Sequence, residues 1–232
     1  MNKTIRNLLA ICIAILPVNI WMIWYRLTQT ENFTTLEMLV YPLVVGGGLS
    51  VLILWLNKVL VKSTFKKTFN PAKETVSSDI VMGILLMLVF FLMFWIEKMT
   101  IYRWFPSITP QSTELSDTVQ SVANSPFLMF VWLGPVLWIG IALFEELSRI
   151  FMLKCLWNIS NNKTWQFIAI FITSLLIGFV HIYQGTAGII SITLKSLLMC
   201  FYFYKFKRIL PLIISHGLYD ALQIIALVGQ FG

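Results

Sequence analysis

Charge is scarce in this chain of 232 residues, because Asp, Glu, Lys and Arg together make up only 12% of it. Soluble domains carry roughly 25% charged residues, so this chain has too few to cover a water-facing surface. Hydrophobic residues account for 58%. The composition excludes an ordinary soluble protein and indicates a polytopic membrane protein whose length suits one domain.

Cysteine is also rare, with Cys12, Cys155 and Cys200 the three in the chain. Each lies in or beside an apolar run, and their spacing matches neither a metal site nor an obvious pair. We interpret them as small core hydrophobes. We therefore expect neither a disulfide nor a cysteine-bound metal.

Long apolar runs are what the chain has in abundance. A helix needs about 20 apolar residues to cross the hydrocarbon core of a bilayer. We therefore predict an all-α fold, a polytopic transmembrane helix bundle of about seven spans. The predicted spans are 8–25, 37–56, 80–96, 127–157, 164–183, 187–204 and 209–228.

The basic residues lie mostly between these spans. If the N-terminus is cytoplasmic, the inner segments 1–7, 57–79, 149–163 and 205–208 hold 13 of the 17 Lys and Arg residues. The positive-inside rule therefore predicts a cytoplasmic N-terminus. It also explains the net charge of +7 without a nucleic-acid partner. We therefore expect the protein to interact with the lipid bilayer and not with nucleic acid.

A few ionisable residues lie inside the apolar runs, where each costs about 2.5–3.5 kcal/mol on insertion scales and usually faces a cavity or a partner. Singly, each fits a structural role, such as a packed histidine or an Arg–Glu helix clamp. Together they include both histidines of the chain, and all lie in its second half, which favours a shared function. The set is Glu145, Glu146, Arg149, His181, Lys195, His216 and Asp220.

Helical spacing groups these residues further. Arg149 follows Glu145 by four residues and Glu146 by three, so one helix turn can pair the guanidinium with one carboxylate and leave the second free. His216 and Asp220 are also four residues apart and share a helix face. If the crossing starts at Phe127, the glutamates lie near its inner end. If Gly134–Pro135 breaks the helix, they lie near mid-membrane.

This set suits hydrolysis of an amide by water. A carboxylate in a poorly hydrated site holds a proton more readily than one in water and can act as a general base. A histidine can stabilise the oxyanion or deliver the water, and a carboxylate at i+4 can fix the imidazole tautomer. No serine stands in G-x-S-x-G, although Ser148 and Ser215 lie beside the motifs as possible nucleophiles.

Zinc is the alternative way to activate water. Two histidines and one or two carboxylates can hold zinc with an open position. However, H-E-x-x-H is absent, and the candidate ligands come from three separate helices. We therefore expect no cofactor and do not favour a zinc site.

Three short motifs resemble those of the CAAX-protease and bacteriocin-processing family (CPBP, also called ABI). That pattern is a Glu pair followed by Arg, then F-x-x-x-H, then H-x-x-x-N/D, each on a separate span. The chain has "EELSR" at 145–149, "IGFVH" at 177–181 and "HGLYD" at 216–220. The order and the hydrophobic surroundings agree. Two departures are the two residues, in place of three, between the Glu pair and Arg149, and Ile177 in place of Phe. The spacing brings Arg149 to Glu145 at i+4.

The resemblance implies an intramembrane glutamate-dependent endopeptidase. By carry-over, Glu145 activates water and Glu146 and Arg149 support it. His181 binds the water or the substrate carbonyl, and His216 with Asp220 stabilises the oxyanion or orients the site. Relatives process CAAX proteins, bacteriocins or signal peptides. The twelve Lys against five Arg favour a bacterial cytoplasmic membrane and a peptide or membrane-protein substrate.

The resemblance covers roughly residues 127–228 and divides the chain in two. Residues 1–126 form N-terminal transmembrane helices and loops, and residues 127–232 form the CPBP-like catalytic helix bundle. Two rival functions stay open. One is a non-catalytic bacteriocin self-immunity or scaffold protein of the same family, and the other is a small transporter that uses Lys195 and the carboxylates as an ion relay. The substrate, the cleavage site and the oligomeric state are not predicted.

Overall fold

The computed structural model of the protein describes residues 2–17, 19, 20, 24, 28, 35–72, 75–105 and 125–229. Across these residues it contains helices and no strand, which confirms the predicted all-α class. The helices are α1 (Lys3–Ala14), α3 (Thr35–Tyr41), η1 (Pro42–Gly46), α4 (Gly47–Val59), α5 (Phe65–Phe69), α6 (Val76–Met99), α7 (Ile101–Trp104), α9 (Pro126–Val131), η3 (Trp132–Leu143), α10 (Phe144–Trp157), α11 (Lys163–Val180), η4 (Ile182–Gln184), α12 (Gly185–Phe206) and α13 (Leu210–Val228).

Within the described residues, six helical stretches are long and apolar enough to cross a membrane. They are Leu39–Val59, Val76–Trp104, Pro126–Trp157, Lys163–Val180, Gly185–Phe206 and Leu210–Val228, and they correspond to six of the predicted spans. The predicted span 8–25 lies partly outside the described residues, and so does most of the segment 97–126 between the predicted spans 80–96 and 127–157. The cytoplasmic N-terminus stays a prediction.

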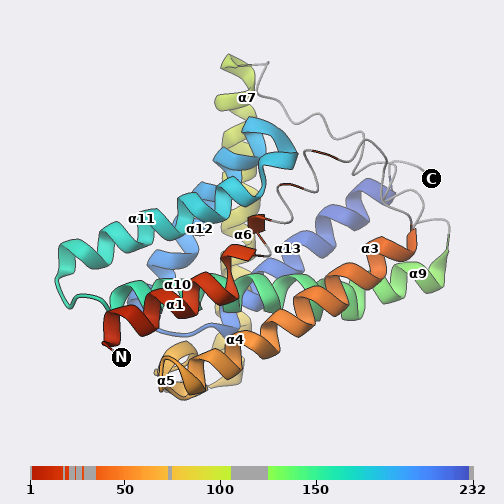
Figure 1. Cartoon of the computed structure of the whole chain (residues 1–232). Helices are drawn as coiled ribbons and strands as arrows, with labels where there is room; N and C mark the ends of the chain where they lie inside the picture. Colours follow the sequence, from red (N-terminus) through yellow and green to blue (C-terminus); the bar gives the residue numbers. More distant parts are fainter. Residues whose placement is uncertain are drawn as a thin grey trace.

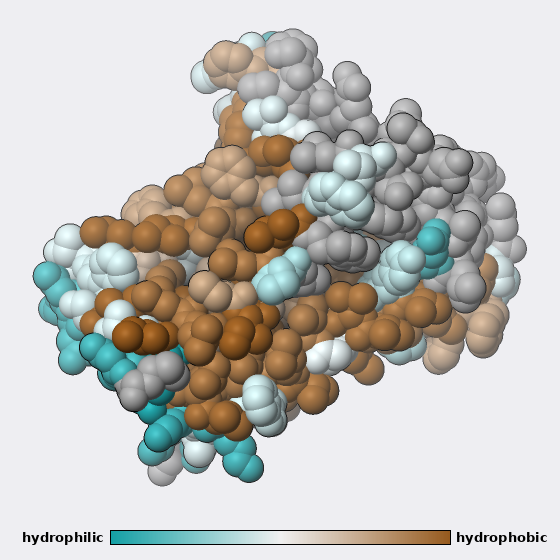
Figure 2. Space-filling view, viewed as in Figure 1, coloured by the Kyte–Doolittle hydropathy of each residue, from teal (hydrophilic) through white to brown (hydrophobic). Residues whose placement is uncertain are grey.

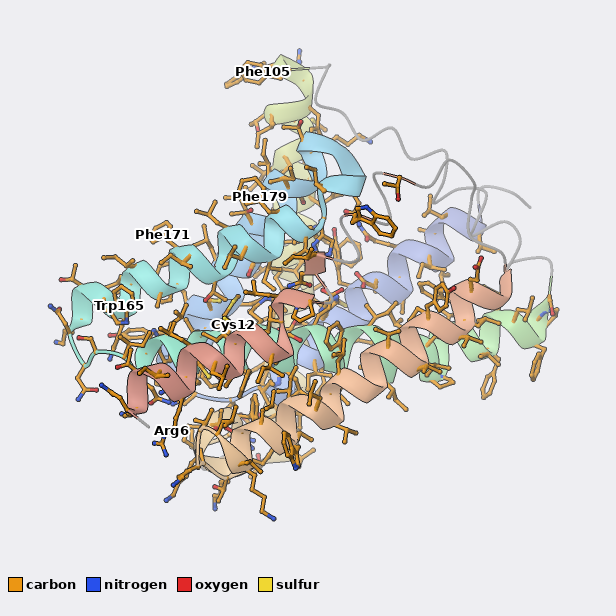
Figure 3. All side chains as sticks on the ribbon, in the orientation of Figure 1. Arg6, Cys12, Phe105, Trp165, Phe171 and Phe179 are labelled. Carbon is orange, nitrogen blue, oxygen red and sulfur yellow. The ribbon has the colours of Figure 1, made fainter. Side chains whose placement is uncertain are left out.

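Large apolar side chains cover the outside of the bundle. Phe171 and Phe179 are both 51% exposed, and Figure 3 shows them projecting from α11 away from its neighbours. Figure 2 shows brown, hydrophobic residues over much of the visible face, while hydrophilic residues gather at the lower left, near the N-terminus and α5. A surface of this kind faces lipid, so the chain is an integral, multi-pass membrane protein.

Helix α10 is the most enclosed element. Every residue from Glu146 to Trp157 is buried except Lys154, because α1, α4, α5, α11 and α12 all pack against α10. In Figure 1 it continues the long rod formed by α9 and η3. Glu146 and Arg149 on this helix are therefore removed from water and must find partners inside the bundle.

The rod from α9 to α10 is continuous but bent. Gly134 has non-helical backbone angles (φ −90°, ψ −108°), and Pro135 follows it inside the π-helical segment η3. A second glycine of this segment lets η1 come close, since a Cβ added to Gly140 would lie 2.6 Å from the carbonyl oxygen of Pro42. The bend and this close contact set the direction in which α10 enters the bundle.

The end of α11 differs from the predicted span, which ran to residue 183. The helix begins after Asn162, whose Oδ1 accepts a hydrogen bond from the Thr164 N–H at 2.9 Å. It ends at Val180, and His181 follows as its C-terminal cap. The turn Ile182–Gln184 leads into Gly185, whose φ of +74° suits glycine. The histidine therefore lies at a helix end, where its direction differs from that of a side chain within the helix.

Candidate active site

The six predicted site residues come from three elements and lie together. Helix α10 carries Glu145, Glu146 and Arg149 in its first two turns, His181 caps α11, and His216 and Asp220 lie on α13. Each of the six lies within 4.0 Å of at least one other through an ionisable side-chain atom.

Glu146 is the buried centre of this group. Its side chain is fully buried, and Oε1 accepts hydrogen bonds from Arg149 Nη1 and from His216 Nδ1, the latter at 2.8 Å. The expectation that Arg149 reaches Glu145 at i+4 is therefore wrong. Successive residues point about 100° apart around a helix. Glu146 and Arg149 face α12 and α13, whereas Glu145 is directed toward both histidines.

Arg149 is held on its other side by α12. Its Nε donates to Ser196 Oγ at 3.1 Å, and Nη1 also lies 3.1 Å from Met199 Sδ. A buried guanidinium needs both a counter-charge and hydrogen-bond acceptors. Glu146 and Ser196 supply them, so this half of the site is a packed anchor that ties three helices together.

Glu145 lies at the open side of the group. Its side chain is 27% exposed, its Oε1 lies 4.0 Å from His181 Nε2, and its Oε2 lies 3.9 Å from His216 Nε2. Both distances exceed a direct hydrogen bond. A single water can bridge polar atoms at such separations, so a water molecule can contact the carboxylate and either imidazole at once.

The ring orientation of His181 follows from its position as a helix cap. Its Nδ1 lies 2.8 Å from the Ile177 carbonyl oxygen. A carbonyl oxygen only accepts, so Nδ1 carries the proton in this contact. In the neutral ring, Nε2 then turns its lone pair toward Glu145, which suits it to accept a proton or a hydrogen bond.

His216 lies between carboxylates on both sides. Nδ1 faces Glu146 Oε1 at 2.8 Å, and Nε2 faces Asp220 Oδ2 at 3.2 Å. Because both neighbours accept hydrogen bonds, the doubly protonated imidazolium satisfies both contacts. Trp138 packs closely against the same turn of α13, since a Cβ added to the adjacent Gly217 would lie 2.7 Å from the Trp138 ring. His216 is thus a fixed cation next to Glu145.

The two serines beside the motifs lack the contacts of a nucleophile. Ser215 Oγ donates to the Leu212 carbonyl oxygen at 2.9 Å and is fully buried. Ser148 Oγ is buried with no hydrogen-bond partner among the described residues. Neither hydroxyl is hydrogen-bonded to an imidazole that could take its proton.

A metal would need several of these donors to converge. In the part of the chain that the structure describes, no three or more His, Cys, Asp and Glu side chains have an arrangement that could hold a metal ion. His216 also turns both ring nitrogens to carboxylates, whereas zinc binds a deprotonated nitrogen. The donor set does not fit zinc, and independence from a cofactor stays a prediction.

Sequence reasoning missed a second polar group beside the first, which we call the lysine cluster. It consists of Glu97, Ser191, Lys195, Tyr219 and Gln223. Lys195 was recognised, but its partners were not. Glu97 lies just past the predicted span 80–96, whereas α6 continues to Met99 and buries it. A signal was present, because positions 216, 219, 220 and 223 form one face of α13 and are all polar.

Comparison with known families finds a match over residues 127–222, described as type II CAAX prenyl endopeptidase Rce1-like. The match includes all six residues of the site. The family resemblance drawn from the three motifs is therefore confirmed, and it supports a protease acting on peptide or protein substrates in a membrane. Neither the curated proteins nor the solved structures yield a match.

Proposed function

Because residues 127–222 belong to the Rce1-like family of type II CAAX prenyl endopeptidases, we propose that this protein is a glutamate-dependent intramembrane endopeptidase. It hydrolyses an amide bond of a peptide or membrane-associated protein with water. The observation that carries the proposal is the position of Glu145, whose two carboxylate oxygens lie 4.0 and 3.9 Å from Nε2 of two different histidines.

The first step is attack by water. Glu145 removes a proton from a water molecule, and the resulting hydroxide forms a C–O bond with the scissile carbonyl carbon. The carbonyl electron pair moves to oxygen, and the His216 imidazolium stabilises this oxyanion. His181, with its proton fixed on Nδ1, orients the water through Nε2.

The second step is collapse of the tetrahedral intermediate. The C–N bond breaks, and the proton held by Glu145 passes to the leaving nitrogen, which restores the carboxylate. Glu146 and Arg149 do not touch the reacting atoms in this scheme. They act as positioning residues, because Glu146 holds His216 and Arg149 neutralises Glu146.

The substrate follows from the surroundings of the site. Glu145 and Asp220 are partly exposed, at 27% and 29%, within helices whose outer faces suit lipid. A membrane-associated peptide can reach such a site without leaving the bilayer. Together with the excess of Lys over Arg, this supports a bacterial cytoplasmic membrane. The substrate there is a bacteriocin or signal peptide, or a CAAX-type protein.

A comparison of peptides from cells that express wild-type protein or Glu145→Ala tests this proposal. We expect one or more uncleaved membrane-associated peptides to accumulate with Glu145→Ala, and purified wild-type protein in vesicles to cleave the same peptides. Lys205→Met, which changes an exposed residue of α12, is the matched control. Identical peptides in the two cell types, with the biological phenotype retained by Glu145→Ala, would instead identify a non-catalytic immunity or scaffold protein.

A further inference from the structure

Lys195 lies near the middle of α12 (Gly185–Phe206), which is one of the membrane-crossing stretches. A lysine at that depth is costly to insert into a bilayer, so it usually has a partner inside the protein. It is not part of the proposed reaction. Its surroundings therefore need a separate explanation.

Tyr219 fixes the lysine ammonium group. Lys195 Nζ donates to Tyr219 Oη at 2.9 Å and lies 4.5 Å from the centre of the same ring. Gln223 Nε2 donates to Tyr219 Oη as well, at 2.7 Å, so both acceptor positions of this hydroxyl are in use. The Tyr219 ring packs against Phe90 and Phe91. The ammonium is thus attached to a rigid, buried support.

Two carboxylates attract this ammonium. Both Glu97 and Asp220 interact with Lys195 electrostatically. Glu97 is 3% exposed, and its Oε2 accepts from Ser191 Oγ at 2.7 Å. Its Oε1 is buried without a hydrogen-bond partner in the described residues. A buried carboxylate in this state needs a cation nearby, and Lys195 provides it.

The lysine cluster adjoins the site through consecutive residues on two helices. Tyr219 is followed by Asp220 on α13, and Lys195 is followed by Ser196 on α12. Ser196 accepts a hydrogen bond from Arg149. The preceding residue of α12, Lys195, contacts Tyr219, which is next to Asp220.

The lysine cluster compensates for an excess of negative charge in the site. Three carboxylates of the site, Glu145, Glu146 and Asp220, face two cations, Arg149 and the His216 imidazolium. Carboxylates crowded in a poorly hydrated site repel one another, and repulsion turns one of them away or protonates it. Lys195 adds the third cation on the Asp220 side.

We propose that Lys195 is a positioning residue of the proposed peptidase, an inference that rests on the proposed function. Its ammonium, fixed on Tyr219, keeps the Asp220 carboxylate directed at His216 Nε2. By directing Asp220, Lys195 fixes the position of the His216 imidazolium that faces Glu145.

Kinetics of the protein in vesicles provide the first test, with Lys195→Met, Lys195→Arg and the control Lys205→Met. We expect Lys195→Met to lower kcat about 10- to 100-fold, the size of effect that misplaced catalytic groups produce. KM should stay near the wild-type value. Lys195→Arg should restore most of kcat because it keeps the charge, and Lys205→Met should behave as wild type. A wild-type kcat in Lys195→Met would overturn the proposal.

A second measurement does not depend on activity. The chain has two histidines, so protein labelled with ¹⁵N-histidine gives only two imidazoles, which His181→Gln assigns. At a fixed pH, Lys195→Met should move the ring resonances of His216 but not those of His181, and Lys205→Met should move neither. If wild type cleaves nothing while His216 still moves, the proposed function fails and the link from Lys195 to His216 stands. If His216 does not move, the link is refuted.

Discussion

Two buried ion pairs, Glu146–Arg149 and Asp79–Arg208, lie in different parts of the bundle and differ in what surrounds them. Asp79 in α6 contacts Arg208 at the junction of α12 and α13, and both are buried. Arg208 Nε and Nη1 have no further hydrogen-bond partner among the described residues. Glu146, in contrast, also contacts His216, and the adjacent Glu145 is partly exposed beside two histidines.

The difference distinguishes a simple helix clamp from the candidate active site. Both pairs neutralise a buried arginine, which any helix bundle needs if it carries one. At Asp79–Arg208 the contacts end with the pair. At Glu146–Arg149 they continue to a histidine, a second carboxylate and an accessible oxygen. A buried ion pair alone is therefore no indication of catalysis, whereas an accessible second carboxylate beside it is.

The largest expected effect concerns the stability of the clamp. Asp79→Ala leaves Arg208 buried without a counter-charge, so we expect the free energy of unfolding to fall by about 3–5 kcal/mol. Denaturation of the detergent-solubilised protein measures this. Asp79→Ala/Arg208→Met should recover most of the loss, because it removes the unpaired charge. The rate of cleavage per folded molecule of Asp79→Ala should match that of wild type. A loss of cleavage beyond the loss of folded protein would mean that Asp79–Arg208 also takes part in activity, as we propose for Glu146–Arg149.

His216→Gln should give a slightly smaller effect, of the opposite kind. Glu146 keeps Arg149 as its partner, so the protein should fold, but the cation that faces the oxyanion is lost. We expect the cleavage rate to fall about 10²- to 10³-fold, as when one oxyanion donor is removed. Single-turnover rates at equal amounts of folded protein measure it. A wild-type rate of cleavage by His216→Gln would mean that His216, like the Asp79–Arg208 pair, has a structural role only.

The smallest expected effect is a pH dependence of stability that arises at Lys207, the residue before Arg208. Burial, followed by the charge of Lys154, lowers the pKa of Lys207 to about 8, whereas a lysine in an unfolded chain titrates near about 10.4. Between these values the unfolded chain binds more protons. The free energy of unfolding therefore rises with pH across this window, by under about 1 kcal/mol for a partly exposed side chain.

Lys207→Gln is the matching variant, because it removes the titrating group and keeps a polar side chain. Thermal unfolding from about pH 7.5 to pH 10.5 should show a flatter profile for this variant than for wild type. Its cleavage activity at neutral pH should be unchanged. The same slope in both proteins would mean that the pKa of Lys207 is not lowered.

Much of the fold followed from hydrophobic length alone. Six spans emerged from runs such as 127–157, since little besides a membrane helix accommodates such runs. The candidate site residues were selected for the related reason that ionisable residues in those runs are rare. The three motifs also predicted the family that the match confirms.

The sequence-based predictions that were wrong or missed concern the direction in which a side chain points and the residue at which a helix ends. The length of an apolar run determines neither. Spacing allowed Arg149 to pair with either glutamate, and the choice of Glu146 is decided by α12 and α13, which no local pattern specifies. Asp79 and Arg208 were assigned to loops because each lies at a span boundary, and their pairing joins residues 129 positions apart. Glu97 was missed for the same reason, because a buried partner on α12 lets the helix continue past it.

The most direct test of the account is the single-turnover rate of peptide cleavage by Glu145→Gln, measured beside wild type and Asp79→Ala at equal amounts of folded protein in vesicles. The amide keeps the size of Glu145 but cannot take a proton from water. We predict a loss of at least about 10³-fold for Glu145→Gln, within the range expected for a general base, and a wild-type rate for Asp79→Ala. Cleavage by Glu145→Gln at the wild-type rate would contradict the central claim that Glu145 is the base.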